Sequence, residues 1–214
     1  MPSRPKLRVA SPLACPVAVA SVLRNPYGVI MRVLTTAEIR SDKLDRVAFR
    51  VIHRLPIQVL LDGVQRPYNL GAVFRLCDAM LVERLIICGG PVDIRNRRFL
   101  QAARGTQRWV PWELAEDAAL AVAALKRQGS RIVVADLASG SVPPERFDPV
   151  FPLCLVVGGE AEGVSQAVID QADAAVAVPM LGMVNSLNVA TATAVVLYYL
   201  TVAARRGDGS IPPV

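Results

Sequence analysis

Apolar residues recur along most of the chain in two different rhythms. From about position 57 onward, short and nearly continuous apolar runs alternate with segments in which apolar residues fall three or four positions apart. Continuous runs are typical of strands buried on both faces of a sheet, and the wider spacing is typical of one face of an α-helix. The expected strands are residues 57–61, 84–88, 131–136, 153–159 and 174–180, and the expected helices are residues 69–80, 116–129, 165–172 and 188–205.

This alternation predicts an α/β domain, built on a mainly parallel sheet with helices on both faces. Residues 1–55 do not follow the rhythm, and we expect a short N-terminal extension there that is partly disordered or involved in substrate recognition. Within it, residues 35–54 have the pattern of a basic amphipathic helix packed on the domain. The domain itself is expected at residues 56–206, followed by a tail at 207–214.

Composition narrows the class of protein. The chain has 214 residues, of which 53% are hydrophobic, enough for one domain with a sizeable core. Its four cysteines lack the spacing of a disulfide framework or a zinc site, and the single histidine, His53, excludes a site built from several histidines. We therefore expect reduced cysteines and no metal. The net charge of +6 favours an anionic partner, although many enzymes without one are also basic.

The N-terminus resembles a secretion signal, because a basic start precedes an apolar run. Pro12 and Pro16 interrupt that run, so we expect a cytoplasmic protein, with Met31 as an alternative start. No stretch reaches the ~18 uninterrupted apolar residues that a membrane span requires.

Candidate chemistry lies in three segments that each follow an expected strand, which is where α/β proteins bind ligands. In the first, residues 62–79, Asn69 is placed to cap the helix and Gly71 allows close approach of another backbone. Arg75 and Asp78 lie three residues apart on the polar face of the same helix. A capped helix with a surface ion pair is the plainer interpretation of this spacing.

The second segment, residues 156–165, has two glycines directly after a strand, followed by Glu160 and Glu162. It lacks the G-x-G-x-x-G order of a dinucleotide site and the lysine of a phosphate-binding loop. Carboxylates at this turn would repel phosphate, and they suit a neutral or cationic ligand. The alternative is a tight strand-to-helix turn in which Ser165 caps the helix.

The third segment, residues 178–188, places Asn185, Ser186 and Asn188 among methionine, leucine and glycine. A helix cap needs only one such side chain, and the surplus is typical of a ligand pocket. Apolar walls combined with amides and a hydroxyl would suit an adenosine.

These three segments resemble the signature motifs of the SpoU (TrmH-like) family of RNA ribose 2′-O-methyltransferases, within the SPOUT superfamily. The similar residues are Asn69, Gly71 and Arg75 in the first motif, Gly158, Glu160 and Gly163 in the second, and the stretch from Pro179 to Val189 in the third. The stretch "ARGTQRWVPW" (103–112) also resembles a segment of the family in which a small residue and glycine are followed by "VPW". The resemblance covers about residues 57–203 and leaves the first 55 residues out.

The resemblance implies an α/β domain whose C-terminal segment is threaded into a trefoil knot, an exception to the rule that chains avoid threading. It also implies a homodimer whose active sites use both subunits, and a pocket that holds S-adenosylmethionine. The residues implied for catalysis are Asn69, Arg75, Glu160, Ser186 and Asn188. The residues implied for the cofactor are Leu137, Gly158, Gly159, Val178, Met180, Gly182, Ser186, Leu187 and Asn188.

Two roles are open for Arg75. The family's motif arginine is proposed as the general base, but a guanidinium stays protonated in proteins, so positioning of the phosphate and ribose is the minimum role. The resemblance further implies that Asn69 orients Arg75 and the ribose, and that Glu160 holds the arginine or the cofactor. No metal is needed, because the sulfonium is both electrophile and leaving group.

RNA contact has separate support between residues 94 and 112, where five arginines occur without an acid and two tryptophans interleave with them. Arginines bind phosphates and aromatic rings stack on splayed bases. For Trp109 and Trp112 we favour core packing, and for the arginines the alternative is a solvated face. The arginines expected to bind RNA are Arg95, Arg97, Arg98, Arg104 and Arg108.

The sequence thus predicts methyl transfer from S-adenosylmethionine to a ribose 2′-OH of a structured RNA, either tRNA or rRNA. The alternative is a non-catalytic RNA-binding protein with a vestigial pocket, and the intact motif side chains count against it.

Overall fold

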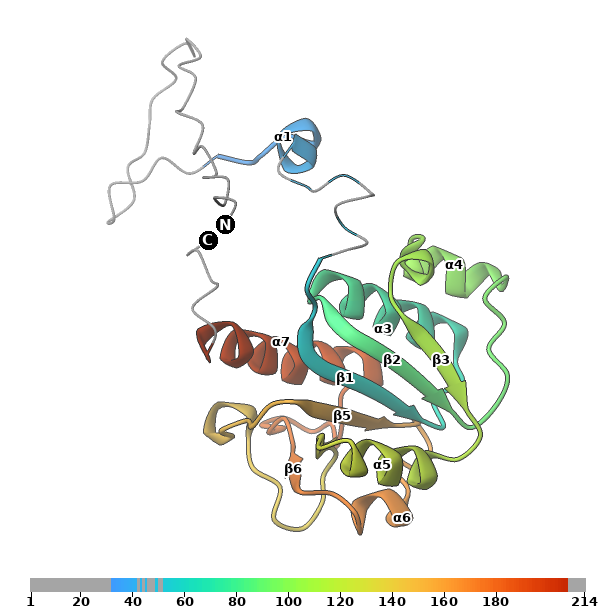
Figure 1. Ribbon diagram of the computed structural model, residues 1–214, viewed down its shortest axis with the longest axis vertical. Helices are drawn as coiled ribbons and strands as arrows, with labels where there is room; N and C mark the ends of the chain where they lie inside the picture. The colour runs from blue at the N-terminus through green and yellow to red at the C-terminus, as the bar shows by residue number, and fades with distance from the viewer. Residues whose placement is uncertain (1–31, 42, 44, 46–48, 50–51, 208–214) are drawn as a thin grey trace, which may run out of the picture. The chain divides into compact units, whose positions relative to one another are not determined.

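The computed structural model describes residues 32–41, 43, 45, 49 and 52–207 (Figure 1), and the chain divides into two units, residues 1–49 and 50–214. The expectations for the first 31 residues, including the alternative start, and for the tail beyond residue 207 lie outside the described residues.

The second unit is built on a six-stranded sheet in which every pair of neighbouring strands is parallel. The strands are β1 (Leu55–Asp62), β2 (Val82–Cys88), β3 (Trp112–Ala115), β4 (Arg131–Ala135), β5 (Leu153–Gly158) and β6 (Ala174–Val176). Their order across the sheet is β3-β2-β1-β5-β4-β6. β5 is buried along its whole length and β1 along most of it, which explains why these central strands are almost entirely apolar.

Helices cover both faces of this sheet (Figure 1). They are α3 (Pro67–Ala79), α4 (Arg97–Ala103), α5 (Ala118–Arg127), α6 (Gln166–Ile169) and α7 (Val189–Gly207), with 3-10 turns at Thr106–Arg108 and Pro144–Arg146. The helices α3, α4 and α7 share one apolar core, which includes Phe74, Phe99 and Leu197. The helices α5 and α6 share the other, which includes Val122 and Val168. The predicted α/β class, with helices on both faces of the sheet, is therefore confirmed.

Close packing of α3 against α4 depends on Gly71. A Cβ atom there would lie 2.5 Å from the carbonyl oxygen of Phe99 and 2.9 Å from the Cβ of Ala102, so the expected close approach is confirmed. Phe74 consequently meets the rings of Phe99 and Trp112 edge-on, with centroids 5.3 and 5.5 Å apart. Trp112 packs on the core, as predicted.

The central strands end level with one another. Asp62 is in register with Cys88 on one side and with Gly158 on the other, and Ala135 pairs with Val157. The loops that follow β1, β4 and β5 therefore leave from the same edge of the sheet. In parallel sheets this carboxyl edge is the usual place for a ligand.

All the strands and helices expected after residue 57 are present, and Gly129 follows α5 with a φ of 89°, as its role of stopping that helix requires. The predicted lengths of one strand and one helix were wrong. β6 ends at Val176, because the chain beyond it leaves the sheet to line a cavity. α6 ends at Ile169, after a single turn. Neither β3 nor α4 was predicted, since β3 has only four residues and α4 starts with two arginines.

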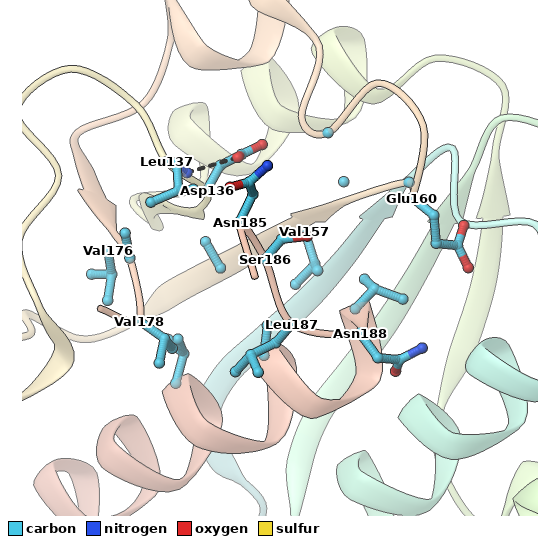
Figure 2. Close-up of a pocket in the computed structure, with 18 of the residues that line it drawn as sticks. Asp136, Leu137, Val157, Glu160, Val176, Val178, Asn185, Ser186, Leu187 and Asn188 are labelled. Atoms are coloured by element: carbon cyan, nitrogen blue, oxygen red, sulfur yellow. Dashed lines mark hydrogen bonds between the residues drawn. The ribbon is translucent and has the colours of Figure 1, made fainter. Parts of the chain in front are cut away.

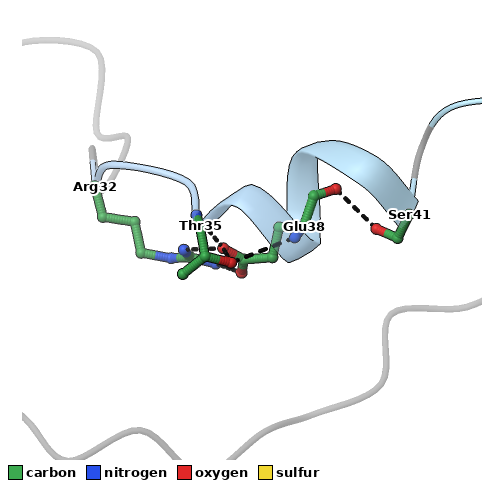
Figure 3. A network of polar contacts seen from close by, with 4 residues as sticks. All are labelled: Arg32, Thr35, Glu38 and Ser41. Atoms are coloured by element: carbon green, nitrogen blue, oxygen red, sulfur yellow. Dashed lines mark hydrogen bonds and ion pairs between the residues drawn. The ribbon is translucent and has the colours of Figure 1, made fainter.

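The first unit contains α1 (Thr36–Ser41), which begins with a capping box (Figure 3). The backbone N–H of Thr35 donates to Oε2 of Glu38 over 2.8 Å, and the N–H of Glu38 donates to Oγ1 of Thr35 over 3.3 Å. Arg32 donates from both terminal nitrogens to the same carboxylate, over 3.0 and 2.5 Å.

The long amphipathic helix predicted over residues 35–54 is wrong. α1 ends at Ser41 with no buried residue, and residues 52–54 have no regular structure, although several positions between them lie outside the described residues. Lys43 and Asp45 lie outside any helix, and the guanidinium of Arg54 donates to the carbonyl oxygens of Val82 and Trp109 over 3.1 and 2.9 Å. These bonds tie the chain that enters β1 to the sheet.

No helix in the described part of the chain is both long and apolar enough to cross a membrane.

Candidate functional site

A cavity of about 400 Å³ opens at the carboxyl edge of the sheet, beside the ends of β4 and β5 (Figure 2). Its volume is typical of sites for small organic ligands. The lining comes from the loops after these strands, from the segment between β6 and α7, and from the start of α7. The lining residues are Arg66 and residues 135–137, 157–160, 163, 176–178, 180, 185–189, 192 and 196.

Glu160 and Asn188 form a polar end of the cavity, and Asp136 lies on the other side with Val176 and Val178. Figure 2 shows Val176 and Val178 at one end, and Glu160 at the opposite end with Asn188 on the same side. Among the described residues that line it, Asp136 and Glu160 are the acids and Arg66 is the cation. Such a cavity suits a ligand with an apolar ring and a positive charge.

Asp136 fixes two of the lining loops. Its Oδ1 accepts the backbone N–H of Leu137 over 2.7 Å, and its Oδ2 accepts the N–H of Val164 over 2.8 Å. One carboxylate therefore joins the loop after β4 to the loop after β5, which preorganises the cavity before any ligand enters.

The loop after β5 folds back onto the end of its own strand at Gly158. A Cβ atom there would lie 1.9 Å from the carbonyl carbon of Gly163 and 2.1 Å from the nitrogen of Val164, so no other residue fits. Gly163 itself has a φ of 68°, in the left-handed region. The backbone N–H of Gly159 donates to the carbonyl oxygen of Asp62 over 2.8 Å, which anchors the same turn to β1.

A chain of three side chains crosses the polar end of the cavity. The amide of Asn69 donates from Nδ2 to Oε1 of Glu160, and Nδ2 of Asn188 donates to Oδ1 of Asn69 over 3.1 Å. The side chain of Asn69 is buried, so both halves of its amide need partners, and both have one. Each of the three sequence motifs contributes one member of this chain.

The expectation that Asn69 caps α3 is wrong. The helix begins earlier, with Arg66 at the cap position and Pro67 at the first helical residue, because the fixed φ of proline already suits a helix start. Asn69 lies inside the first turn, and its amide takes part in the hydrogen bonds to Glu160 and Asn188. Ser165 does occupy the cap position of α6, but its side chain makes no capping bond.

Asn188 is a side chain that does cap a helix. Its Oδ1 accepts the backbone N–H groups of Ala190 and Thr191 over 3.0 and 3.4 Å, at the start of α7. Ser186 lines the cavity two residues earlier.

Sequence reasoning missed Arg66. Its Nε lies 3.7 Å from Oε1 of Glu160, and 74% of its side chain is exposed at the cavity. The carboxylate of Glu160 therefore faces an arginine of the first motif, but this arginine is Arg66 and not Arg75. The one signal in the sequence was its position directly before Pro67 in that motif.

Arg75 lies on the exposed face of α3 and does not line the cavity. The proposed surface ion pair between Arg75 and Asp78 is absent from the ion pairs of the described residues. Asp78 instead interacts electrostatically with Arg54.

Most residues expected to bind the cofactor converge on the cavity. They are Leu137, Gly158, Gly159, Val178, Met180, Ser186, Leu187 and Asn188. Gly182 does not line it. The side chains of its neighbours Leu181 and Met183 are almost fully exposed, so this part of the third motif projects into solvent.

The five arginines expected to bind RNA are all exposed, around α4 and the 3-10 turn that follows it. Arg104 has a φ of 55° at the end of α4, where its backbone N–H donates to the carbonyl oxygen of Leu100. Within the described residues, none of the five takes part in an ion pair. No group of three or more potential metal-binding side chains occurs among these described residues either.

The parallel sheet and the cavity at its carboxyl edge define an α/β protein with a pocket of nucleoside size. Residues 56–198 match the model of the SpoU rRNA Methylase family. Because the match covers more than half of the chain, the protein belongs to this family.

Two relatives of known activity are similar in sequence. The tRNA (guanosine(18)-2′-O)-methyltransferase of Escherichia coli (strain K12) is 34% identical over 155 residues, which are 72% of this chain and 66% of that protein. The 23S rRNA (guanosine(2553)-2′-O)-methyltransferase RlmP of Bacillus subtilis (strain 168) is 32% identical over 142 residues, which are 66% of this chain and 56% of that protein. The chain thus spans two thirds or less of the length of these relatives.

Two solved structures share the fold. The A. aeolicus TrmH/SpoU tRNA modifying enzyme has a TM-score of 0.69 at 30% identity, over 77% of this chain and 83% of that one. The AdoMet-bound rRNA methyltransferase from Sinorhizobium meliloti has a TM-score of 0.63 at 29% identity, over 74% of this chain and 60% of that one.

Proposed function

We propose that this protein transfers a methyl group from S-adenosylmethionine to a ribose 2′-OH of a structured RNA, tRNA or rRNA. The observation that carries the proposal is the hydrogen-bonded chain of Glu160, Asn69 and Asn188, because it joins all three motifs at the polar end of a nucleoside-sized cavity. The relatives that methylate ribose in tRNA and rRNA, and the AdoMet-bound neighbour, support the reaction class.

The residues of the cavity fit S-adenosylmethionine. Apolar walls from Val176 and Val178 suit the adenine ring, and the carboxylates of Asp136 and Glu160 suit a cationic ligand. The folded-back turn at Gly158 leaves backbone groups facing the cavity, where a larger residue would fill the space. When bound, the cofactor supplies a methyl group on a positively charged sulfur, which is both the electrophile and the leaving group.

In the reaction, the ribose O2′ forms a bond to the methyl carbon. The bound cofactor would supply this methyl group and keep the electron pair of the carbon–sulfur bond on its sulfur, and the 2′-OH proton would leave to water. The task of the protein is to hold the ribose in line with the bond that breaks. Asn69, Glu160, Ser186 and Asn188 would form the fixed wall against which the ribose is held.

Arg75 would position the phosphate and ribose of the substrate from the exposed face of α3. An arginine is suited to this task, because its planar fork binds a phosphate through two nitrogens and its charge persists at neutral pH. The lack of an ion-pair partner among the described residues leaves this guanidinium available to RNA.

We also infer a homodimer and a trefoil knot. Tyr198 and Tyr199 are exposed on α7, although the opposite face of this helix is buried under the sheet, and a second hollow of about 530 Å³ lies beside them. A second copy would cover this face. The resemblance to the family implies the knot, and the lining of the cavity by the segment between β6 and α7 supports it.

Binding of RNA is supported by two basic regions. The five exposed arginines around α4 form the first. Residues 1–49 form the second, since they contain eight lysines and arginines against three acids, whereas residues 50–214 contain 16 against 15. A basic extension on a nearly neutral domain would bind the phosphate backbone, and an RNA substrate would place the protein in the cytoplasm.

The test is to map 2′-O-methylation in total RNA. A strain without the gene should lose methylation at one or a few nucleotides, and the wild-type gene should restore it. Genes that encode Arg75→Ala or Arg75→Lys should fail to restore it, whereas Arg127→Ala, an exposed arginine at the end of α5, should succeed. If no methyl group is lost and the purified protein transfers no tritium from methyl-labelled cofactor to RNA, the proposal is wrong and a non-catalytic RNA-binding protein remains.

A further inference from the structure

The start of α3 displays an aromatic ring and a cation beside the buried Asn69. Tyr68 is 62% exposed, and the side chain of Arg66 is 74% exposed. Most of a tyrosine ring is normally buried in a folded protein, so a ring this exposed beside Asn69 is available to a ligand.

Helix geometry places Tyr68 in line with Arg75. Seven residues make almost two full turns, so the two side chains point in nearly the same direction, about 10 Å apart along the helix axis. The residue between them on this face is Ala72, which is small. The face of α3 formed by Tyr68, Ala72 and Arg75, which we call the floor, therefore has an aromatic ring at one end and a guanidinium at the other.

Neighbouring elements border this floor on both sides. Gly71 lies against the backbone of α4 on one side, and Asn69 bonds to the start of α7 on the other. Figure 1 accordingly shows α3 between α4 and α7. The floor is thus an open face of α3 that leads to the polar end of the cavity, where Arg66 lies.

Arg66 has donors to spare at that end. Its distance of 3.7 Å to Glu160 is an ion pair but is too long for a hydrogen bond. Glu160 is already held by Asn69, so it does not depend on Arg66 for its orientation. The guanidinium is free to bind a phosphate without disturbing the chain of Glu160, Asn69 and Asn188.

We propose that Arg66 and Tyr68 position the substrate nucleotide, with the guanidinium on a phosphate beside the reacting ribose and the phenol ring stacked on an unpaired base. This inference rests on the proposed function and narrows its substrate. A ring can stack only on a base that is splayed out, so the nucleotide bound here lies in a loop or another unpaired segment. Stacking tolerates any base, so Tyr68 selects for the unpaired state and not for base identity.

Methyl transfer from tritiated cofactor, with tRNA and rRNA transcripts as probes, tests the role of Tyr68. Tyr68→Ala should raise the KM for RNA about 10-fold, in line with the loss of one stacked base, while Tyr68→Phe should keep the wild-type KM. Leu120→Ala, which truncates an exposed side chain on the opposite face of the sheet, should leave it unchanged. Affinity for the cofactor, measured by calorimetry, should stay within about twofold in Tyr68→Ala, because the ring does not line the cavity.

The role of Arg66 is read from salt dependence. Arg66→Ala should lower the slope of RNA affinity against salt by about one phosphate contact, and Arg127→Ala should not change it. A slope that is the same in Arg66→Ala as in the wild type would exclude a phosphate contact.

Two RNA hairpins that carry the mapped nucleotide either in the loop or in the paired stem give the decisive comparison. The wild type should methylate the loop form faster, and Tyr68→Ala should lose most of that preference. An unchanged preference in Tyr68→Ala, or a change of its oligomeric state in light scattering, would overturn the inference. A wild-type protein that methylates neither hairpin nor any transcript would instead overturn the proposed function.

Discussion

The side chain of Asn188 donates to Oδ1 of Asn69 over 3.1 Å and, with its own oxygen, accepts the backbone N–H of Ala190 over 3.0 Å. One residue therefore caps α7 and orients a buried amide of α3. The carboxylate of Glu160 can only accept a hydrogen bond, so the Nδ2 group of Asn69 must face it. The donor and acceptor roles in the hydrogen bonds among Glu160, Asn69 and Asn188 follow from that single constraint.

Asn188→Asp and Asn188→Ala separate these two tasks. An aspartate still caps α7 but cannot donate to Asn69, so we expect the free energy of unfolding to fall by about 1 kcal/mol for the unpaired amide oxygen and turnover to fall about 10-fold or more. An alanine loses the cap as well, and its free energy of unfolding should fall by about 1 kcal/mol more. Urea unfolding and single-turnover methyl transfer measure the two effects. Full turnover in Asn188→Asp would show that the donated bond is dispensable.

Gly158 and Gly182 form a matched pair. A Cβ on Gly158 would meet backbone atoms at 1.9 Å and 2.1 Å, whereas a Cβ on Gly182 would meet nothing within 4 Å. Gly158→Ala must therefore displace the turn that lines the cavity, and we expect cofactor binding to fall below detection in calorimetry. Gly182→Ala should keep an affinity within a few-fold of the wild type. Equal affinities in the two variants would remove Gly158 from the cofactor site.

The sheet and the presence of a pocket could be predicted from the sequence on physical grounds, whereas the individual lining residues were implied by the resemblance to the family. Strands buried on both faces appear as continuous apolar runs, and the polar residues after them exceed what helix capping requires. The hydrogen-bond partners could not be predicted in this way. Asparagine is a residue type that commonly caps helices, and only the packing of α3 against α7 shows that the amide of Asn69 faces Glu160 and Asn188.

Long-range contacts explain the other misses. Arg66 was missed because no local pattern indicates that Glu160 comes within 3.7 Å of it. At the entry to β1, Arg54 bonds to carbonyls 28 and 55 residues away, which no local pattern encodes. Tertiary contacts override local propensity at such positions.

The buried thiols should report on unfolding. Burial raises the pKa of Cys88 to about 12 and raises those of Cys77 and Cys154 further above the usual range. In a Cys15→Ser background, these three thiols should react with a thiol reagent only as fast as the domain opens. Because the thiol form is favoured in the folded state, this contribution to stability is complete below about pH 8.5 and should decline as the pH rises toward 12. Rapid labelling under native conditions would contradict the burial.

The cap of α1 should survive mild acid. A hydrogen bond from Arg32, followed by bonds from Thr35, lowers the pKa of Glu38 to about 2. A lowered pKa means that the cap is complete above the ordinary glutamate pKa of about 4.3 and is lost only as the pH falls through about 2. Titration of the carboxyl carbon of Glu38 by NMR measures this directly. Arg32→Ala should move the midpoint up toward the ordinary value, and an unchanged midpoint would exclude Arg32 as the cause.

Arg54 ties the entry of the chain to two distant segments of the sheet. Its Nη1 donates to the carbonyl oxygen of Val82 at the start of β2, and its Nη2 donates to that of Trp109. Burial lowers the pKa of this guanidinium, and Asp78 opposes that effect, so the group stays charged over the whole working range of pH. Charged hydrogen bonds to partly buried carbonyls contribute more to stability than neutral ones do.

We therefore expect Arg54→Ala to lower the free energy of unfolding by about 2 kcal/mol, because both carbonyls lose their donor. Arg54→Lys should recover part of this loss, since a single ammonium cannot span two carbonyls held apart by a fork. Arg127→Ala, which removes an exposed arginine of α5, should change the same free energy by less than about 0.5 kcal/mol. Urea unfolding followed by tryptophan fluorescence measures all three variants, with an unchanged slope against urea as the sign that the folded and unfolded states are otherwise the same. If Arg54→Ala unfolds at the same urea concentration as Arg127→Ala, the two hydrogen bonds do not stabilise the domain, and the path of the chain into β1 is set by the strand alone.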